Sequence, residues 1–228
     1  MRIDCHCHTI YSKHFLWGYD ALNKPRDLIK AAIKKGLDGI AVTDHDTVRG
    51  SIVAKRVAKS FKGFLVITGS EIKTKEGEIQ GLGITKNIPK DLSIEETVEK
   101  IHDLGGIAIA VHPFGSYLLR KGVEHSAIKA DAVEIFNAAN LFQGSNNKAS
   151  MLARRYKMPV TAGSDAHNTR EVGNAGIICT GDPLNAIMKK KVKVFGKRNT
   201  VADMAVLMSK KFMRSAGWRL SGGRGKHV

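Results

Sequence analysis

The sequence predicts an α/β fold in which mainly parallel strands close into a barrel. Three observations predict it. Short apolar runs alternate with helical segments along most of the chain, as βα units require. The length of 228 residues suits one large domain with a sizeable core, and a single α/β barrel commonly has this length. Clusters of histidine and carboxylate residues also follow several of the strands, and active sites of such barrels assemble at the carboxyl ends of the strands.

The first strand, expected at the start of the chain, contains two histidines that alternate with cysteines. Side chains alternate between the two faces of a strand, so Asp4, His6 and His8 are expected on one face. Two neighbouring imidazoles on one face can share a divalent cation. Cys5 and Cys7 are expected to pack on the other face as small apolar groups, because cysteines one residue apart do not build a disulfide framework.

A long polar and aromatic loop is expected over residues 9–24, and loops of this length in compact domains often have a function. Pro25 then begins a helix that Gly36 ends. The elements expected next are a strand over 38–43, a helix over 48–60, a strand over 64–68, and a hairpin over 72–84 that turns at Glu76 and Gly77.

Ser93 and Glu96 form the pattern of a capping box, which predicts a helix over 94–104. Further along, Pro113 is expected to keep the backbone of His112 extended, at the end of a strand. The remaining elements expected are strands over 107–111, 131–136, 159–162, 175–179 and 192–196, and helices over 145–156, 183–190 and 200–213.

The positive charge is concentrated near the C-terminus. The chain has a net charge of +16, and residues 186–228 contain twelve Lys or Arg against one acidic residue. We expect residues 1–213 to form one barrel domain and residues 214–228 to be a basic, Gly-rich, disordered tail. Such a segment is usually solvated, and binding of nucleic acid is the alternative. Without a signal peptide or an apolar run long enough to span a bilayer, we expect a soluble, cytoplasmic protein with no membrane partner.

Five motifs carry candidate metal ligands, and each lies near the end of a different expected strand. Their donors are five imidazoles and two carboxylates, namely His6, His8, His45, His112, His167, Glu71 and Asp165. This number exceeds the ligands of one tetrahedral ion and indicates two or three divalent ions. Mixed nitrogen and oxygen ligands suit Zn²⁺, Mn²⁺ or Fe²⁺ better than Mg²⁺ or Ca²⁺. Asp4 and Asp44 are expected to support the ligands without binding metal themselves, as carboxylates that hydrogen-bond to ligating groups do.

Clustered divalent ions make one kind of chemistry accessible. They lower the pKa of a bound water, so that a metal-bound hydroxide forms near neutral pH, and they clamp the attacking and leaving oxygens of a displacement at phosphorus. A separate catalytic nucleophile from the protein is then unnecessary. The residues therefore favour metal-dependent hydrolysis, in which a metal-bound hydroxide is the nucleophile.

The ordered motifs resemble those of the PHP (polymerase and histidinol phosphatase) family. The resemblance runs from Arg2 to Gly176 through these segments: Asp4-Cys5-His6-Cys7-His8-Thr9, Thr43-Asp44-His45-Asp46, Glu71 after Gly69-Ser70, His112-Pro113, and Gly163-Ser164-Asp165-Ala166-His167. It implies a distorted (β/α)7 TIM-like barrel that holds up to three metal ions and hydrolyses phosphoesters.

Carried over by position, the resemblance assigns ligands to three ions. One ion would be held by His6, His8, Glu71 and Asp165, a second by Glu71 and His112, and a third by His14, His45 and His167. Gln80 occupies the hairpin position where family members often have His. An amide oxygen is a poorer zinc ligand than an imidazole, so the second ion is expected to bind weakly or to require Mn²⁺.

A phosphate substrate also needs cationic contacts, for which we select Arg49 and Arg170, each a few residues past a ligand motif. The expected activity is hydrolysis of a phosphomonoester of a small phosphorylated metabolite or nucleotide. Alternatives are an exonuclease acting on oligonucleotide ends, which the basic C-terminal segment would help to bind, and a non-catalytic RNA-binding subunit resembling the p30 protein of ribonuclease P. A His-x-His amidohydrolase is a further alternative, which the Thr-Asp-His-Asp and Gly-Ser-Asp-Ala-His motifs disfavour.

Overall fold

The computed structural model describes residues 1–13, 20–115, 122–140, 142–200 and 209. Three of the expectations from the sequence lie outside these residues. They are the ligand role of His14, the helix over 200–213 apart from Thr200 and Ser209, and the tail over 214–228.

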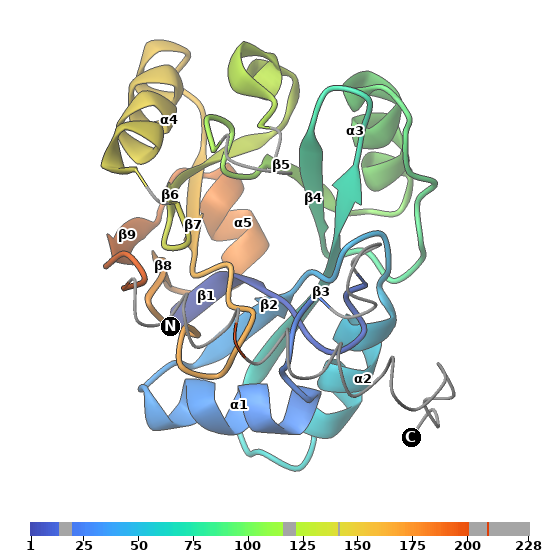
Figure 1. Ribbon diagram of the computed structural model, residues 1–228, viewed down its shortest axis with the longest axis vertical. Coiled ribbons are helices and arrows are strands. Elements are labelled where there is room, and N and C mark those ends of the chain that lie inside the picture. The colour runs from blue at the N-terminus through green and yellow to red at the C-terminus, as the bar shows by residue number, and fades with distance from the viewer. Residues whose placement is uncertain (14–19, 116–121, 141, 201–208, 210–228) are drawn as a thin grey trace.

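In the described part of the chain, nine strands form one mixed sheet that curls into a nearly closed barrel (Figure 1). The strands are β1 (Arg2–Cys7), β2 (Gly39–Val42), β3 (Leu65–Lys73), β4 (Glu78–Leu82), β5 (Ile107–Ala110), β6 (Ala132–Asn137), β7 (Val160–Gly163), β8 (Ala175–Ile178) and β9 (Lys193–Gly196). Their order is β7-β6-β5-β4-β3-β2-β1-β8-β9. The pairs β1–β2, β2–β3, β5–β6 and β6–β7 are parallel, whereas β4, β8 and β9 pair antiparallel with their neighbours. The predicted barrel is confirmed.

The ring of strands closes where the chain leaving β7 meets β1. The amide of Asp165 donates to the carbonyl of His6 at 2.8 Å, and the amide of His8 donates to the carbonyl of Ala166 at 3.0 Å. Gly163 permits this approach, because a Cβ atom added there would lie 2.2 Å from the Cβ of His6. The closure therefore brings the first and last ligand motifs of the sequence side by side.

Helices cover the outside of the barrel and one of its ends. They are α1 (Pro25–Lys34), α2 (Arg49–Ala58), α3 (Ile94–Asp103), the 3₁₀ helix η1 (Glu124–Lys129), α4 (Gln143–Arg155) and α5 (Pro183–Met188). The predicted capping box is present, since Ser93 Oγ accepts from the Glu96 amide and Glu96 Oε2 accepts from the Ser93 amide. No helix of the described residues is both long and apolar enough to span a bilayer.

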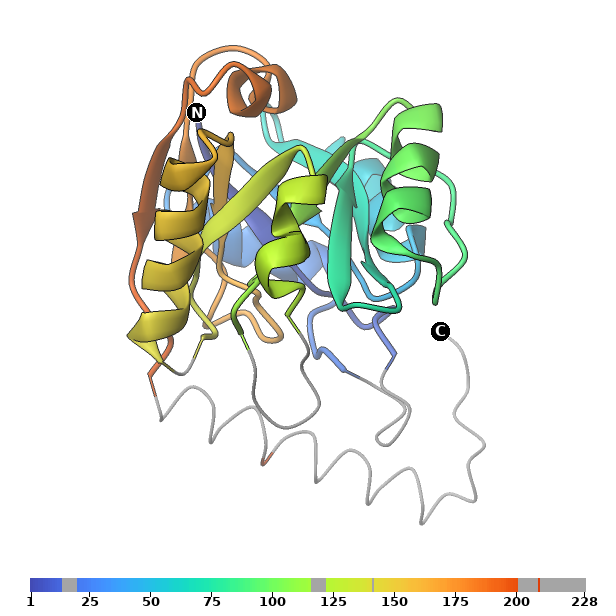
Figure 2. The ribbon, with the colours of Figure 1, turned by 90° about the horizontal axis from the view of Figure 1, so that it is seen from above.

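Three apolar clusters divide the core. One lies under α1 and α2, and a second lies under α3, η1 and α4. The third lies within the ring of strands and joins Ile3, Leu82 and Ile109 to Ile187 of α5. In Figure 2 this helix covers the end of the barrel where the chain begins. Apolar side chains therefore fill this end of the barrel, and the polar side chains lie at the other end, where the parallel strands have their carboxyl ends.

The structure corrects the predicted alternation of side chains in β1. Cys5 packs with Ile3 inside the ring, but Cys7 packs outside it under α1 and α2. The cause is an irregularity in pairing with β2, because the register shifts between Asp4 and Cys7. Extra residues of this kind interrupt the two-residue period of a strand. The cysteines are thus buried apolar groups, as expected, but not on one face.

The strand expected over 64–68 and the first arm of the hairpin are one continuous strand, β3. Glu71 therefore lies within a strand rather than just past its end. The hairpin itself is confirmed, and Glu71 pairs with Gln80 across it.

Candidate metal centre

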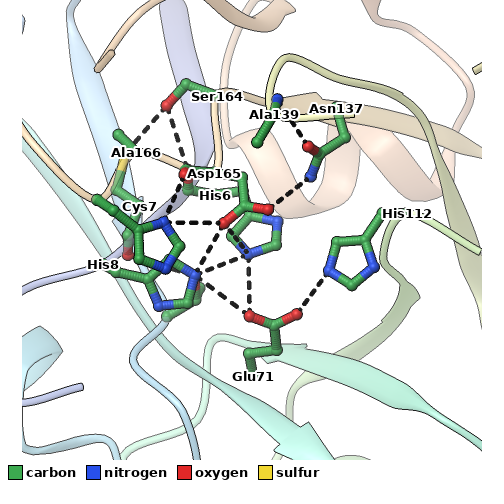
Figure 3. A network of polar contacts seen from close by, with 12 residues as sticks. His6, Cys7, His8, Glu71, His112, Asn137, Ala139, Ser164, Asp165 and Ala166 are labelled. Carbon is green, nitrogen blue, oxygen red and sulfur yellow. Dashed lines mark hydrogen bonds and ion pairs between the residues drawn. The ribbon is translucent and has the colours of Figure 1, made fainter. Parts of the chain in front are cut away.

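The predicted ligands converge inside one end of the barrel. His6 and His8 leave the end of β1, His45 follows β2, Glu71 lies on β3, His112 follows β5, and Asp165 and His167 follow β7. Figure 3 shows His6, His8, Glu71, His112 and Asp165 pointing toward one another from these separate segments. The ring centroid of His8 lies 5.1 Å from that of His6 and 4.4 Å from that of His167.

Glu71 connects imidazoles from three parts of the chain. Its Oε1 lies 2.8 Å from His112 Nε2, and its Oε2 lies 3.1 Å from His6 Nε2. The same Oε2 lies 3.2 Å from His8 Nε2. Burial acts to raise the pKa of Glu71, but the surrounding histidines hold it well below its usual value.

Asp165 has the corresponding position on the opposite side of His6 and His8. Its Oδ1 lies 3.3 Å from His8 Nε2 and 3.5 Å from His167 Nδ1. Its Oδ2 accepts a hydrogen bond from Asn137 Nδ2 at 3.2 Å. The backbone of Asp165 has φ 54°, a left-handed conformation that Asp and Asn adopt more readily than most residues. Each of the two buried carboxylates, Glu71 and Asp165, thus lies between imidazoles from different segments of the chain.

The nearby carboxylates shift the pKa values of two histidines. Burial disfavours the charged form of His6, yet the carboxylates of Asp165 and Glu71 outweigh it and hold the pKa of His6 well above its usual value. The pKa of His45 is likewise raised well above its usual value, because Glu71 and Asp20 outweigh burial. The neighbouring carboxylates and imidazoles thus favour the charged forms of one another.

Donors close enough to share a cation form four groups in the described part of the chain. The atoms within each group lie within 4.8 Å of one another, and the groups are His8–Asp20–His45–His167, His6–Glu71–His112, His6–His8–Asp165 and His45–Glu71–Glu78. Buried imidazole and carboxylate donors of this kind fit Zn²⁺, Mn²⁺ or Fe²⁺. The residues present therefore suit the divalent metals that the sequence predicts.

Four of the residues in and around the centre escaped the sequence interpretation. Asp20 lies in the long loop, and its Oδ2 is 2.6 Å from His167 Nε2 and 3.3 Å from His45 Nε2. Burial acts to raise the pKa of Asp20, but these histidines hold it well below its usual value. The second residue is Glu78, which precedes Gln80 by two positions on β4. Residues two apart in a strand share a face, so the choice of Gln80 as a candidate ligand could also have indicated Glu78.

Glu134 and Asn137 on β6 are the other two. Glu134 Oε1 lies 3.1 Å from His6 Nδ1, and its Oε2 accepts from the His112 amide at 2.8 Å and from Asn137 Nδ2 at 2.9 Å. The available signal was that Glu134 is flanked on both sides by apolar residues of the expected strand, because an acid buried in a strand needs partners.

Two expectations about supporting residues need correction. Asp4 accepts from the backbone amides of His6, Ser164 and Gly173 and from the Ser164 hydroxyl. In the described part of the chain its hydrogen bonds therefore go to the backbone and to a hydroxyl rather than to an imidazole. The shifted register of β1 is the reason, since it breaks the shared face of Asp4 and His6. The backbone of His112 is not extended before Pro113 but has φ 30°.

Asp44 stabilises the loop after β1. Its two oxygens accept from the amide and the hydroxyl of Thr9, at 2.5 and 2.7 Å. Both arginines chosen for phosphate binding have exposed side chains. The Arg49 guanidinium carbon lies 5.2 Å from the centroid of the Tyr11 ring, and the backbone of Arg170 bonds to Asn168 and Lys35. Their role toward substrate stays a prediction.

The chain matches known families and proteins along most of its length. The profile of the PHP domain matches residues 4–140, and a PHP-associated profile matches residues 143–185. An uncharacterised protein of Methanocaldococcus jannaschii is 45% identical over 142 residues, which are 60% of this chain and 82% of that protein.

Two relatives have named activities. A Caldicellulosiruptor bescii protein named "Probable phosphatase" is 26% identical over 86% of this chain and 94% of its own. A 5'-3' exoribonuclease of Haemophilus influenzae is 29% identical over 58% of this chain and 45% of its own.

Two solved structures share the fold. One is a protein of Bifidobacterium adolescentis provisionally described as a metal-dependent phosphoesterase, with TM-score 0.60, 17% identity and coverage of 91% of this chain and 96% of that one. The other is an amidohydrolase of Chromobacterium violaceum, with TM-score 0.64, 17% identity and coverage of 89% and 100%. At this identity the two structures support the barrel fold alone.

Proposed function

Since the chain belongs to the PHP domain family, we propose that it is a divalent-metal-dependent phosphoesterase that hydrolyses phosphomonoesters. The substrates of this proposal are small phosphorylated compounds or nucleotides. The relative named "Probable phosphatase" supports the choice, because the alignment covers 94% of that protein and 86% of this chain.

The observation that carries the proposal is the placement of Glu71 and Asp165. Each carboxylate lies within 3.5 Å of imidazole nitrogens from at least two separate segments, in a buried centre at the carboxyl end of the barrel. The residues that would hold two or three ions are His6, His8, His45, Glu71, His112, Asp165 and His167, together with Asp20. The ligand roles of His14 and Gln80 stay part of the proposal.

When bound, the ions would supply a nucleophilic water near neutral pH and would neutralise charge on the phosphate oxygens. The chain's own residues hold the donors in place. Glu134 fixes one nitrogen of His6, Asn137 fixes one oxygen of Asp165, and Asp44 fixes the loop at Thr9. Arg49 and Arg170 are proposed to bind the phosphate from the solvent side, where guanidinium groups can form paired hydrogen bonds.

A second candidate is an exonuclease that acts on oligonucleotide ends. The observation that favours it is the positive charge near the end of the sequence, where residues 186–228 contain twelve Lys or Arg against one acidic residue. Such cations can bind a phosphate backbone. The exoribonuclease relative supports the same candidate. The donor set is nearly complete, which disfavours a purely non-catalytic RNA-binding role.

One substrate comparison separates the candidates. Turnover of a chromogenic phosphomonoester, a nucleoside bisphosphate and short RNA or DNA would be measured with added Mn²⁺ or Zn²⁺. The proposal predicts turnover of the monoester or the bisphosphate. Salt-sensitive processing of oligonucleotides with little monoester turnover would replace it with the exonuclease, since backbone binding weakens with salt.

A further inference from the structure

An irregularity in β6 brings two polar side chains of that strand together at the metal centre. The register of β6 against β7 shifts between Glu134 and Phe136. A shift of this kind interrupts the alternation of side chains along a strand, so Glu134 and Asn137 contact each other although they are three residues apart. Asn137 Nδ2 donates to Glu134 Oε2 at 2.9 Å and to Asp165 Oδ2 at 3.2 Å (Figure 3). One amide group therefore holds two carboxylates of the centre.

A helix outside the barrel holds the backbone of Asn137. Asn146 of α4 accepts from the Asn137 amide through Oδ1 at 3.1 Å, and its Nδ2 donates to the Asn137 carbonyl at 3.2 Å. In the described part of the chain β5 ends at Ala110, which pairs with Val133, so this neighbouring strand does not reach Asn137. A side-chain amide offers the donor and the acceptor of a peptide group. Asn146 thus takes the place of a neighbouring strand at the end of β6.

The orientation of the Asn146 amide is fixed by a third asparagine. Asn140 Nδ2 donates to Asn146 Oδ1 at 2.7 Å, so this oxygen accepts two hydrogen bonds while the nitrogen donates to Asn137. Asn137, Asn140 and Asn146 are 0%, 4% and 3% exposed. Turning the amide would leave buried polar groups without partners, which is costly. The position of the Asn137 backbone is therefore closely defined by α4.

The contacts of this amide group continue to the predicted metal ligands. Asn146 holds the backbone of Asn137, and the side chain of Asn137 contacts Asp165 directly. The second carboxylate that it holds, Glu134, lies 3.1 Å from His6 Nδ1 through its other oxygen. Groups that hydrogen-bond to metal ligands set the orientation of those ligands and change metal affinity when they are removed.

We propose that Asn146 is a positioning residue of the metal centre, which acts through Asn137 on Asp165. The inference rests on the proposed metal-dependent function and extends the groups that support it to a helix outside the barrel. Asn137 lies in the segment that matches the PHP domain, and Asn146 lies in the segment that matches the PHP-associated profile. The contact between them thus gives the second segment a role in metal binding.

The test is a double-mutant cycle that measures metal affinity. Metal-free, full-length protein is titrated with Zn²⁺ by isothermal calorimetry as the wild type, Asn137→Ala, Asn146→Ala and the double variant. Asn137→Ala should weaken Zn²⁺ binding about tenfold or more, because it removes a contact to a ligand. Asn146→Ala should weaken it about threefold or more. Since Asn146 acts through Asn137, the double variant should bind Zn²⁺ no more weakly than Asn137→Ala.

A control variant separates positioning from stabilisation of the helix. Ala149 is buried on α4, three residues after Asn146, and Ala149→Gly weakens the helix while Asn146 keeps its amide. Urea unfolding of the metal-free protein should show lower stability in both Asn146→Ala and Ala149→Gly. Only Asn146→Ala should bind Zn²⁺ more weakly and change the visible spectrum of bound Co²⁺, which depends on the geometry of the ligands.

Three results would overturn the inference. They are wild-type Zn²⁺ affinity in Asn146→Ala, effects of Asn137→Ala and Asn146→Ala that add in the double variant, and an equal loss of affinity in Ala149→Gly. If Asn146→Ala does not fold, Asn146→Asp replaces it in the cycle and is judged by the same results. Aspartate keeps the acceptor for the Asn137 amide and loses the donor to the Asn137 carbonyl. A wild-type protein that binds no divalent ion would instead overturn the proposed function, and the inference with it.

Discussion

Glu134 Oε1 lies 3.1 Å from Nδ1 of His6, on the side of the ring opposite to Glu71, which contacts Nε2. A carboxylate in this position accepts a hydrogen bond from Nδ1–H and leaves the lone pair of Nε2 available to a cation. The other oxygen of Glu134 accepts from the amide of His112, whose φ of 30° is unfavourable for a non-glycine residue. One buried glutamate on β6 thus fixes two predicted ligands from other segments.

Replacing Glu134 by Gln should lower the affinity for divalent metal about 10- to 100-fold, the usual cost of losing such a supporting contact. The amide keeps the shape of the side chain but cannot accept from His6 through its nitrogen. Isothermal titration of the metal-free protein with Zn²⁺ would measure the loss. Glu99→Gln, which removes a charge from an exposed position on α3, serves as the control. An affinity equal to that of the control would show that Glu134 does not support the metal ligands.

Replacing His8 by Ala should abolish hydrolysis of phosphomonoesters while leaving the fold intact, because its imidazole lies between Glu71 and Asp165. For Asp165 the informative variant is Asp165→Asn. Asparagine tolerates the left-handed backbone at φ 54°, so loss of charge is separated from backbone strain. Circular dichroism checks the fold, and wild-type turnover in either variant would refute the ligand assignment.

The pKa shifts predict how metal-free stability depends on pH. The raised pKa values of His6 and His45 contribute stability that is fully present below about pH 6.5 and is lost as pH rises through their folded-state values. The lowered pKa values of Glu71 and Asp20 contribute stability above about pH 4, and this is lost as pH falls through their folded-state values. The metal-free protein should therefore lose stability as the solution becomes alkaline.

Bound metal should reverse this trend, because a metal ligand must be a neutral imidazole and protons compete with the cation. The increase in Tm caused by Zn²⁺ or Mn²⁺ is expected to be larger at about pH 8.5 than at about pH 6. Thermal unfolding followed by circular dichroism at both pH values measures it. An increase that is the same at both pH values, or larger at the lower one, would contradict the histidine network.

Gly163→Ala should destabilise the protein by about 1 to 3 kcal/mol, since the new methyl group would overlap His6 where β7 approaches β1. Gly144→Ala is the matched control. It lies in α4 with open space around it, where alanine should stabilise the helix by about 0.5 to 1 kcal/mol. Urea unfolding compares the two, and equal effects would show that the closure at Gly163 is not tight.

The sequence predicted the barrel and the convergence of the main candidate ligands because both depend on local patterns. Pro25, Gly36 and the capping box at Ser93 mark the ends of helices, and the apolar runs between helices mark the strands. The ligand motifs lie near the ends of these strands in the sequence. It could not predict the supporting residues. Glu134 acquires its role only when β6 lies beside the segment after β5, which brings it to the amide of His112.

The errors have the same origin. The role given to Asp4 assumed a regular strand, whereas a register shift against β2 reorients β1 after that residue. The backbone of His112 was expected to follow the local preference before proline, but its amide bonds to Glu134 at φ 30°. Tertiary contacts therefore override local rules at the centre itself, where strain is commonly found.

The most direct test of the central claim is elemental analysis of the purified protein, combined with phosphomonoester turnover before and after removal of metal by a chelator. The account predicts two or three divalent ions per chain, loss of turnover on chelation, and recovery of turnover with added Mn²⁺ or Zn²⁺. A protein that contains no divalent metal, or that hydrolyses the ester equally well after complete chelation, would contradict it.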